Sequence, residues 1–147
     1  MKLSAHFSLD EFTQSNTAER LNIDNSLPPE LLQTAQNTAD MMERIRLALG
    51  GKPILITSGY RCPDLNKAIG SGPGSDHPKA MAVDFKCPEF GTPYEVARFL
   101  AQQMTGLGIG QLIYEQTWVH VSTRHPDKAV NTILTMRKGA YSPGINP

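Results

Sequence analysis

The chain has 147 residues, which suits one domain and allows roughly two-thirds of the unfolded surface to be buried. Lys plus Arg and Asp plus Glu each total 14, so the formal net charge is zero. This balance argues against non-specific nucleic-acid binding, which needs a basic face, and provides no attraction to an anionic envelope.

The N-terminal segment and the cysteines indicate the compartment of synthesis. The first residues turn polar at once and show no apolar core of a secretion signal, so we expect synthesis in the cytoplasm. No apolar run approaches the ~20 residues of a membrane span, which predicts no membrane insertion. Cys62 and Cys87 are too few for a disulfide framework and are expected to be free thiols, although a bridge between them is possible.

The first part of the chain is predicted to be mainly helical. A capping box over residues 8–11 opens a short helix, and residues 16–27 are expected to be irregular. Two prolines then open a long helix over about residues 28–49, which Gly50 ends. Its apolar side chains recur at helical spacing and predict core packing: Leu31, Leu32, Ala35, Ala39, Met42, Ile45 and Leu49.

A strand and a glycine-rich loop follow. Residues 53–57 form a short apolar run with β-branched members, which predicts a buried strand that ends at residues 58–61. Residues 63–69 are expected to form a short helix. Residues 70–75 are too rich in glycine to be regular, and they lack the Lys and Ser/Thr of a phosphate-binding loop.

The last third predicts a helix and several strands. A second capping box opens a helix over residues 93–104, and residues 109–115 and 118–124 have the pattern of a hairpin. Residues 131–137 are expected to form a last strand, and residues 138–147 a loose tail. There is no internal repeat and no linker, so we expect a single domain over the whole chain.

Three residues have the character of metal ligands. In residues 80–85 the side chains alternate, so Asp84 and two small alanines share one strand face while larger apolar residues enter the core. In residues 118–122 the same alternation turns His120 away from the core, and His77 comes from the glycine-rich loop. Two imidazoles and one carboxylate, with a fourth position for water, are the ligand set of a catalytic zinc.

This set predicts one zinc ion and a hydrolytic reaction. A histidine is more often an ordinary hydrogen-bonded residue than a ligand, so spacing alone leaves that alternative open. His6 and His125 lie in no comparable setting and are interpreted as ordinary residues.

The order of these motifs resembles that of the zinc murein peptidases, which include D-Ala-D-Ala carboxypeptidases and L-Ala-D-Glu endopeptidases. The resemblance covers about the first 125 residues and rests on Thr57–Pro63, Asn66, Ile69–Ser71, the Ser75/His77/Asp84 run and Trp118–Val121. Residues 7–12 and 18–25 resemble the phage-associated, single-domain branch.

The resemblance implies roles for five residues. It implies that His77, Asp84 and His120 hold the zinc, and that Arg61 meets the substrate peptide. A guanidinium suits that task because its planar fork binds carboxylates and steadies negative charge, although a structural salt bridge is the alternative. Ser75 is expected to hydrogen-bond near the metal or the substrate, with a simple turn role as its alternative.

Two positions depart from the family pattern. Ala80 stands where relatives often have glycine, a mild change if the backbone there is extended. Many relatives place the acid/base carboxylate three residues before the last ligand, where this chain has Thr117. Glu115 is the nearest carboxylate, and we expect it to be the general base and then the proton donor, with a solvated hairpin residue as the alternative. Trp118 is expected to pack beside His120 or to form a cleft wall, or to be a half-exposed aromatic.

We therefore expect an α+β protein in which helices cover one face of a small, mostly antiparallel sheet and the other face carries the zinc cleft. The resemblance implies the compact fold shared with hedgehog-like domains. It also implies a monomeric peptidase acting on the peptidoglycan stem peptide, a phage-type L-Ala-D-Glu endopeptidase released through a holin. The alternatives are a D-Ala-D-Ala carboxypeptidase, a hydrolase of a non-murein peptide, and a non-catalytic zinc module for wall binding or virion structure.

Overall fold

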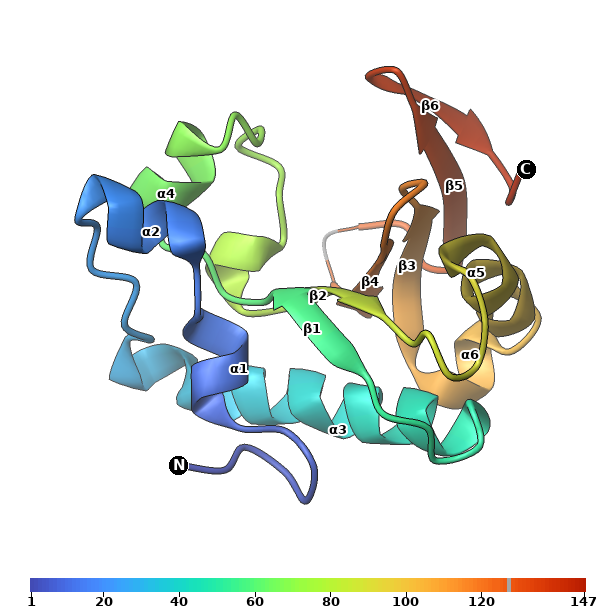
Figure 1. Cartoon of the computed structure of the whole chain (residues 1–147), viewed down its shortest axis with the longest axis horizontal. Helices are drawn as coiled ribbons and strands as arrows, with labels where there is room; N and C mark the ends of the chain where they lie inside the picture. Colours follow the sequence, from blue (N-terminus) through green and yellow to red (C-terminus); the bar gives the residue numbers. More distant parts are fainter. Residues whose placement is uncertain (127) are drawn as a thin grey trace.

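The computed structural model describes residues 1–126 and 128–147 and combines helices with a single six-stranded sheet (Figure 1). The helices, of which the two η elements are 3-10 helices, are α1 (Leu9–Thr13), α2 (Asn16–Leu21), η1 (Pro29–Leu31), α3 (Leu32–Ala48), α4 (Pro63–Ala68), η2 (His77–Lys79), α5 (Pro93–Ala101) and α6 (Met104–Leu107). The strands are β1 (Leu55–Ser58), β2 (Ala82–Lys86), β3 (Ile109–Tyr114), β4 (Val119–Thr123), β5 (Thr132–Arg137) and β6 (Ala140–Pro143).

The sheet is mixed. Its strand order is β1-β2-β4-β3-β5-β6. β5 runs parallel to β3, whereas the other neighbouring strands are antiparallel. The α+β class is confirmed. The expectation of a mostly antiparallel sheet is corrected at the β3–β5 pair, which is parallel.

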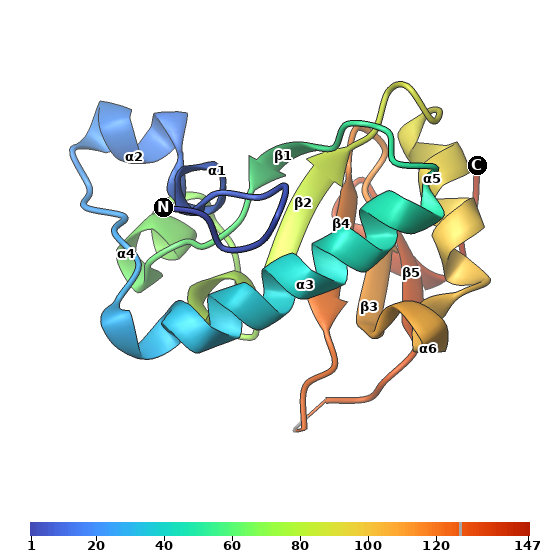
Figure 2. The same ribbon diagram turned by 90° about the horizontal axis from the view of Figure 1, so that it is seen from below.

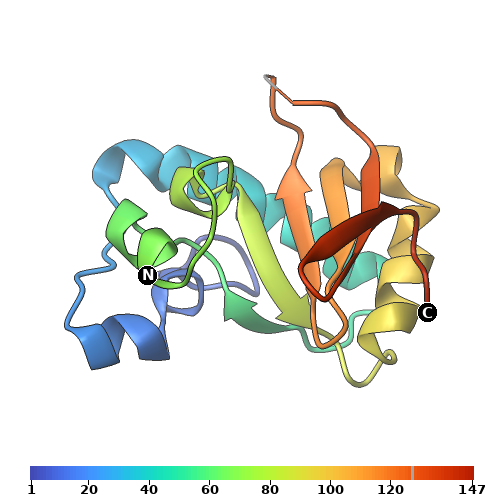
Figure 3. The same cartoon turned by 90° about the horizontal axis from the view of Figure 1, so that it is seen from above.

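One face of the sheet carries the core. α3, α5 and α6 lie against this face, and Figure 2 shows α3 crossing β2 and β4. The strand residues that enter the core alternate along the chain, as in Val83 and Phe85 or Val119 and Val121. The opposite face is left open between α4 and the β5–β6 hairpin (Figure 3). No helix among the described residues is both long and apolar enough to cross a membrane.

Local signals position several helix ends as expected. The Ser8 side chain accepts from the Glu11 backbone N–H while the Glu11 carboxylate accepts from the Ser8 N–H, which completes the first capping box. Thr92 and Glu95 repeat this arrangement at α5. Gly50 adopts a φ of 79° just after α3 and ends it.

The segment expected to be irregular over residues 16–27 contains α2, so that prediction is wrong for its first half. Ser15 caps this helix by accepting a hydrogen bond from the Ala18 N–H. Asn22 ends it in the left-handed region at φ 54°. A capping serine and a terminating asparagine were the signals available in the sequence.

The strand expected to be buried over residues 53–57 is an edge strand. Within residues 1–126 and 128–147, β1 pairs only with β2 in the sheet, and the register breaks between Ile56 and Ser58. Ile56 is buried, whereas Leu55 is 57% exposed.

The C-terminal residues correct two further expectations. The strand expected over residues 131–137 is present as β5, but it is not the last strand, and residues 138–147 are not simply a loose tail, because β6 pairs with β5 in register. Lys138 and Gly139 both have positive φ, at 52° and 78°, which is the geometry of a two-residue hairpin turn. The Asn146 N–H donates to the Thr135 hydroxyl and ties the chain end to β5.

Candidate metal centre

Sheet register sets the predicted ligands side by side on the open face. Asp84 of β2 pairs with His120 of β4, which in turn pairs with Ile113 of β3. Ile113 pairs with Leu134 of β5, so four side chains form one row across four strands. Paired residues on neighbouring strands point to the same face, which brings the Asp84 carboxylate to the His120 ring.

His77 reaches the same point from η2, outside the sheet. Its Nδ1 lies 2.6 Å from the Gly59 carbonyl oxygen, and its Nε2 lies 3.4 Å from Asp84 Oδ1. A carbonyl only accepts, so Nδ1 carries the proton and the Nε2 lone pair faces Asp84. Position 59 requires glycine, because a Cβ added there would lie only 2.6 Å from the Phe12 carbonyl oxygen.

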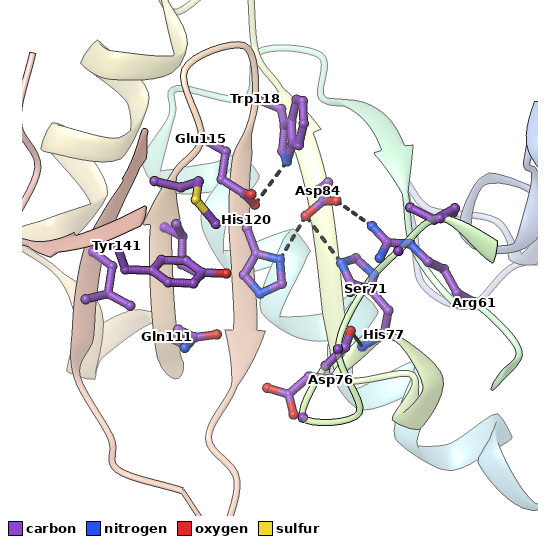
Figure 4. A pocket seen from close by; sticks show the side chains of 18 of the residues that line it. Arg61, Ser71, Asp76, His77, Asp84, Gln111, Glu115, Trp118, His120 and Tyr141 are labelled. Atoms are coloured by element: carbon purple, nitrogen blue, oxygen red, sulfur yellow. Dashed lines mark hydrogen bonds and ion pairs between the residues drawn. The ribbon is translucent and has the colours of Figure 1, made fainter. Parts of the chain in front are cut away.

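His120 completes the cluster. Its Nδ1 lies 2.8 Å from Asp84 Oδ1, and its Nε2 lies 3.1 Å from the Ser122 hydroxyl. One ligand atom from each of His77, Asp84 and His120 lies within 4.8 Å of the other two, and all three residues are buried. Figure 4 shows both rings turned toward the Asp84 carboxylate. Two imidazole nitrogens and one carboxylate oxygen at this spacing fit the three-ligand set of a catalytic zinc.

The protonation states suit a cation. Burial alone would raise the pKa of Asp84, but its interactions with His120 and His77 outweigh this effect, and the pKa lies well below its usual range. Burial lowers the pKa of His77, which favours the neutral imidazole. A metal requires an ionised carboxylate and a neutral ring, and the fold favours these two forms at Asp84 and His77.

Arg61 lies beside the cluster and is held by three side chains. Its Nη2 donates to Asp84 Oδ2 at 3.0 Å, its Nε to the Ser58 hydroxyl at 3.0 Å and its Nη1 to Asn66 Oδ1 at 3.3 Å. The salt bridge left open as an alternative is therefore present. A guanidinium has five N–H groups, so these bonds leave two further donors on a residue that lines the cleft.

The cluster forms the floor of a cleft of about 520 Å³. Arg61, Ile69 and the glycine-rich loop, residues 70–75, form one bank. The other bank consists of side chains from β3, β5, β6 and the residue after β3, namely Gln111, Ile113, Leu134, Met136, Tyr141 and Glu115. The cleft is thus open between a polar loop and a largely apolar sheet surface (Figure 4).

Glu115 and Trp118 stand at the end of the β3–β4 hairpin and both line the cleft. The indole N–H of Trp118 donates to Glu115 Oε2 at 3.1 Å. Burial raises the pKa of Glu115, and the negative charge of Asp84 raises it further. Thr117 is exposed in the turn, away from the residues of the cleft.

Ser75, the last residue of the glycine-rich loop, and the following Asp76 also line the cleft. The Ser75 hydroxyl accepts a hydrogen bond from the His77 backbone N–H at 3.2 Å, so it supports the turn that positions His77. Asp76 is 3% exposed and its Oδ1 lies 2.7 Å from Lys128 Nζ. Sequence reasoning missed this pair because its members lie far apart along the chain, and no local pattern links them.

Replacing the glycine of many relatives by Ala80 was expected to be a mild change if the backbone were extended, but it is not extended. It adopts φ 60° and ψ 27° after η2, the left-handed conformation that favours glycine. An alanine in this region costs roughly 1–2 kcal/mol. The surrounding structure supports it, because the Thr38 hydroxyl donates to the Ala80 carbonyl at 2.7 Å and the residue is buried.

Both cysteines are free, as expected. The Cys62 sulfur accepts from the Leu65 N–H at the start of α4, and Cys87 is buried in the core.

Comparison with known proteins identifies the family. No curated protein matches the chain. The family model described as Peptidase M15 matches residues 5–122, a range that contains the whole His77, Asp84 and His120 cluster. M15 peptidases are zinc-dependent, which agrees with the ligand set on the cleft floor. The chain belongs to the Peptidase M15 family.

Proposed function

We propose that this protein is a zinc-dependent peptidase that hydrolyses an amide bond in the peptidoglycan stem peptide. The observation that carries the proposal is the buried cluster of His77, Asp84 and His120 at the floor of an open cleft, in a chain of the Peptidase M15 family. A buried carboxylate with two imidazoles has little purely structural value, because burying such groups is costly unless something binds them.

The proposed ligands are His77 through Nε2, Asp84 through Oδ1 and His120 through Nδ1, which are the atoms that converge. The Gly59 carbonyl and the Ser122 hydroxyl hold the two rings by their other nitrogens. A single zinc ion bound there supplies Lewis acidity toward a water molecule and the scissile carbonyl.

Glu115 is the proposed general base. It takes a proton from the water whose oxygen bonds to the scissile carbon, and it delivers that proton to the amine nitrogen as the C–N bond breaks. The raised pKa of this carboxyl suits both directions of transfer. Trp118 holds Oε2 by its indole N–H, so Oε1 is the oxygen left to accept the proton.

Arg61, Ser75 and Trp118 are the proposed substrate-binding residues. The N–H groups of Arg61 that its three partners leave over can bind a substrate carboxylate or the negative charge that develops on the carbonyl oxygen. Ser75 and Trp118 both line the cleft and would contact the peptide.

Among murein bonds we favour the L-Ala-D-Glu amide, with the D-Ala-D-Ala amide as the second choice. The resemblance of residues 7–12 and 18–25 to the phage-associated branch supports the first choice, since a lysis enzyme must cut within the stem. We further propose a monomeric single domain, made in the cytoplasm, where its free cysteines would stay reduced, and released through a holin. The competing function is a non-catalytic zinc module, because Thr117 stands where many relatives have the acid/base carboxylate.

The test is mass spectrometry of purified peptidoglycan after incubation with the zinc-loaded protein, with His120→Ala as the control. New N-terminal D-Glu stems, absent with the variant, would support the endopeptidase. Loss of the terminal D-Ala alone would indicate the carboxypeptidase. Bound zinc without any fragment would reject catalysis in favour of the non-catalytic module.

A further inference from the structure

The cleft uses residues that lie beyond the family match. The match ends at residue 122, whereas Leu134, Met136 and Tyr141 line the cleft from β5 and β6. The two strands therefore add a wall to a site whose metal ligands all precede them.

Register explains why these side chains face the cleft. β5 pairs in parallel with β3 so that Leu134 stands opposite Ile113, in the same row as His120. Met136 lies two residues further along β5 and so points to the same face. Tyr141 of β6 pairs with Met136, which places its side chain on the open face next to Glu115.

We infer that Tyr141 is a substrate-binding residue whose hydroxyl donates a hydrogen bond to an oxygen of the bound peptide, on the side of the metal ligands opposite Arg61. Figure 4 shows its ring extending over the sheet, with the hydroxyl directed toward His120. This inference rests on the proposed function. It adds a substrate contact on the second bank of the cleft, across the proposed metal ligands from Arg61.

The environment of Tyr141 fits a ligand contact better than a structural role. The residue is 58% exposed, unlike the buried Tyr60 and Tyr114. Within residues 1–126 and 128–147 its hydroxyl makes no hydrogen bond, although it points into a cleft lined by polar groups. A tyrosine held in this way offers a rigid ring and a free donor at little entropic cost.

The neighbours of Tyr141 indicate what the hydroxyl would help to select. Ile113, Leu134 and Met136 form an apolar stretch of the second bank, on the two strands between β6 and β4. These three side chains suit a small aliphatic group, such as the methyl group of alanine, and carry no charge. The bound segment would therefore carry a small apolar residue on the Tyr141 side and a carboxylate or carbonyl on the Arg61 side.

The first test compares Tyr141→Phe with Ser142→Ala on the zinc-loaded enzyme, using a stem peptide that contains the L-Ala-D-Glu bond. Both variants lose one hydroxyl, but Ser142 points to the other face of β6. We expect Tyr141→Phe to lower kcat/KM about tenfold, mainly through KM, with zinc content and Tm unchanged. Equal kcat/KM for both variants would overturn the inference.

The second test separates this inference from the proposed catalysis. Titration calorimetry of the same peptide against Glu115→Ala, with and without Tyr141→Phe, measures binding when no hydrolysis occurs. A Kd about tenfold weaker in the double variant supports the hydroxyl contact even if the enzyme cleaves nothing. Equal affinity, or no binding by either protein, rejects it.

Discussion

The cluster of His77, Asp84 and His120 and the β5–β6 hairpin differ in how deeply their side chains are buried and in how many partners hold them. His77, Asp84 and His120 are 2%, 4% and 8% exposed, and backbone or side-chain partners hold each of them. Tyr141 on the hairpin is 58% exposed, and among the described residues its strand pairs only with β5. The comparison teaches that the candidate metal ligands are fixed by many contacts, whereas the side chain at the edge of the sheet is held by few and is the easier of the two to change.

The largest effect should follow from removing the shared carboxylate. Asp84→Asn keeps the size of the side chain but removes the charge that both imidazoles and Arg61 contact. We expect loss of zinc by elemental analysis and loss of hydrolysis. Asp10→Asn changes an exposed carboxylate of α1 and should do neither. Retention of stoichiometric zinc by Asp84→Asn would show that the ligand set is wrong.

Removing the proposed base should separate chemistry from metal binding. Glu115→Ala should reduce hydrolysis about 10²–10⁴-fold, the usual worth of a positioned acid/base group, while zinc stays bound. Glu89→Ala removes an exposed carboxylate and serves as the matched control. If hydrolysis is unchanged in Glu115→Ala, another group moves the proton.

The support behind His120 should matter less than His120 itself. Ser122→Ala removes the hydroxyl 3.1 Å from His120 Nε2 and frees the ring to rotate. We expect zinc affinity to fall about 10–100-fold in a chelator competition assay, as for other outer partners of metal-bound histidines. Ser142→Ala on the hairpin should leave zinc affinity unchanged, and equal affinities in the two variants would remove Ser122 from the site.

The Asp76–Lys128 pair links the glycine-rich loop to the segment before β5, and its effect should depend on pH. Burial would raise the pKa of Asp76, but the hydrogen bond and charge of Lys128 lower it overall. A folded-state pKa below the unfolded value of about 3.9 stabilises the fold above that pH, and the benefit disappears as the pH falls through the folded pKa.

Lys128→Met should therefore lower the free energy of unfolding at pH 7 more than at pH 3, as measured by urea denaturation. Lys67→Met, which removes an exposed lysine of α4, controls for loss of charge. A difference between Lys128→Met and the wild type that is the same at both pH values would contradict the ion-pair explanation.

The smallest effect should be confined to the hairpin. Gly139 has φ 78°, and a Cβ added there would meet no atom within 4 Å, so Gly139→Ala introduces strain but no clash. We expect a cost of about 1 kcal/mol, faster hydrogen exchange in β5 and β6, and unchanged zinc affinity. A fall in zinc affinity would show that the hairpin and the metal cluster are not independent.

Much of this protein could be predicted from local sequence. Capping boxes at Ser8 and Thr92, the helical stripe of α3 and the period-two alternation in β2 and β4 depend on residues a few positions apart. Alternation also predicted that Asp84 and His120 leave the core side of the sheet. The residue types and the order of the motifs were enough to predict the family and the three residues that the fold brings together, whereas their role as zinc ligands stays a prediction.

Other features depend on contacts between distant segments. Local sequence does not specify that β5 runs parallel to β3, or that Arg61 bonds Asp84 rather than standing free. The left-handed Ala80 was expected to be extended, because its conformation follows from how η2 meets β2. The Asp76–Lys128 pair likewise joins residues that only the folded chain brings together.

Sequence alone determined which residues could hold a metal, because ligand chemistry and strand alternation are properties of short segments. Tertiary structure decided what surrounds them: the second bank of the cleft, the partners of each ligand and the place of Tyr141. The physical reason is that sheet register is a non-local choice. It is set by the packing of the whole sheet against α3, α5 and α6, and only then do residues 84, 120, 113 and 134 fall in one row.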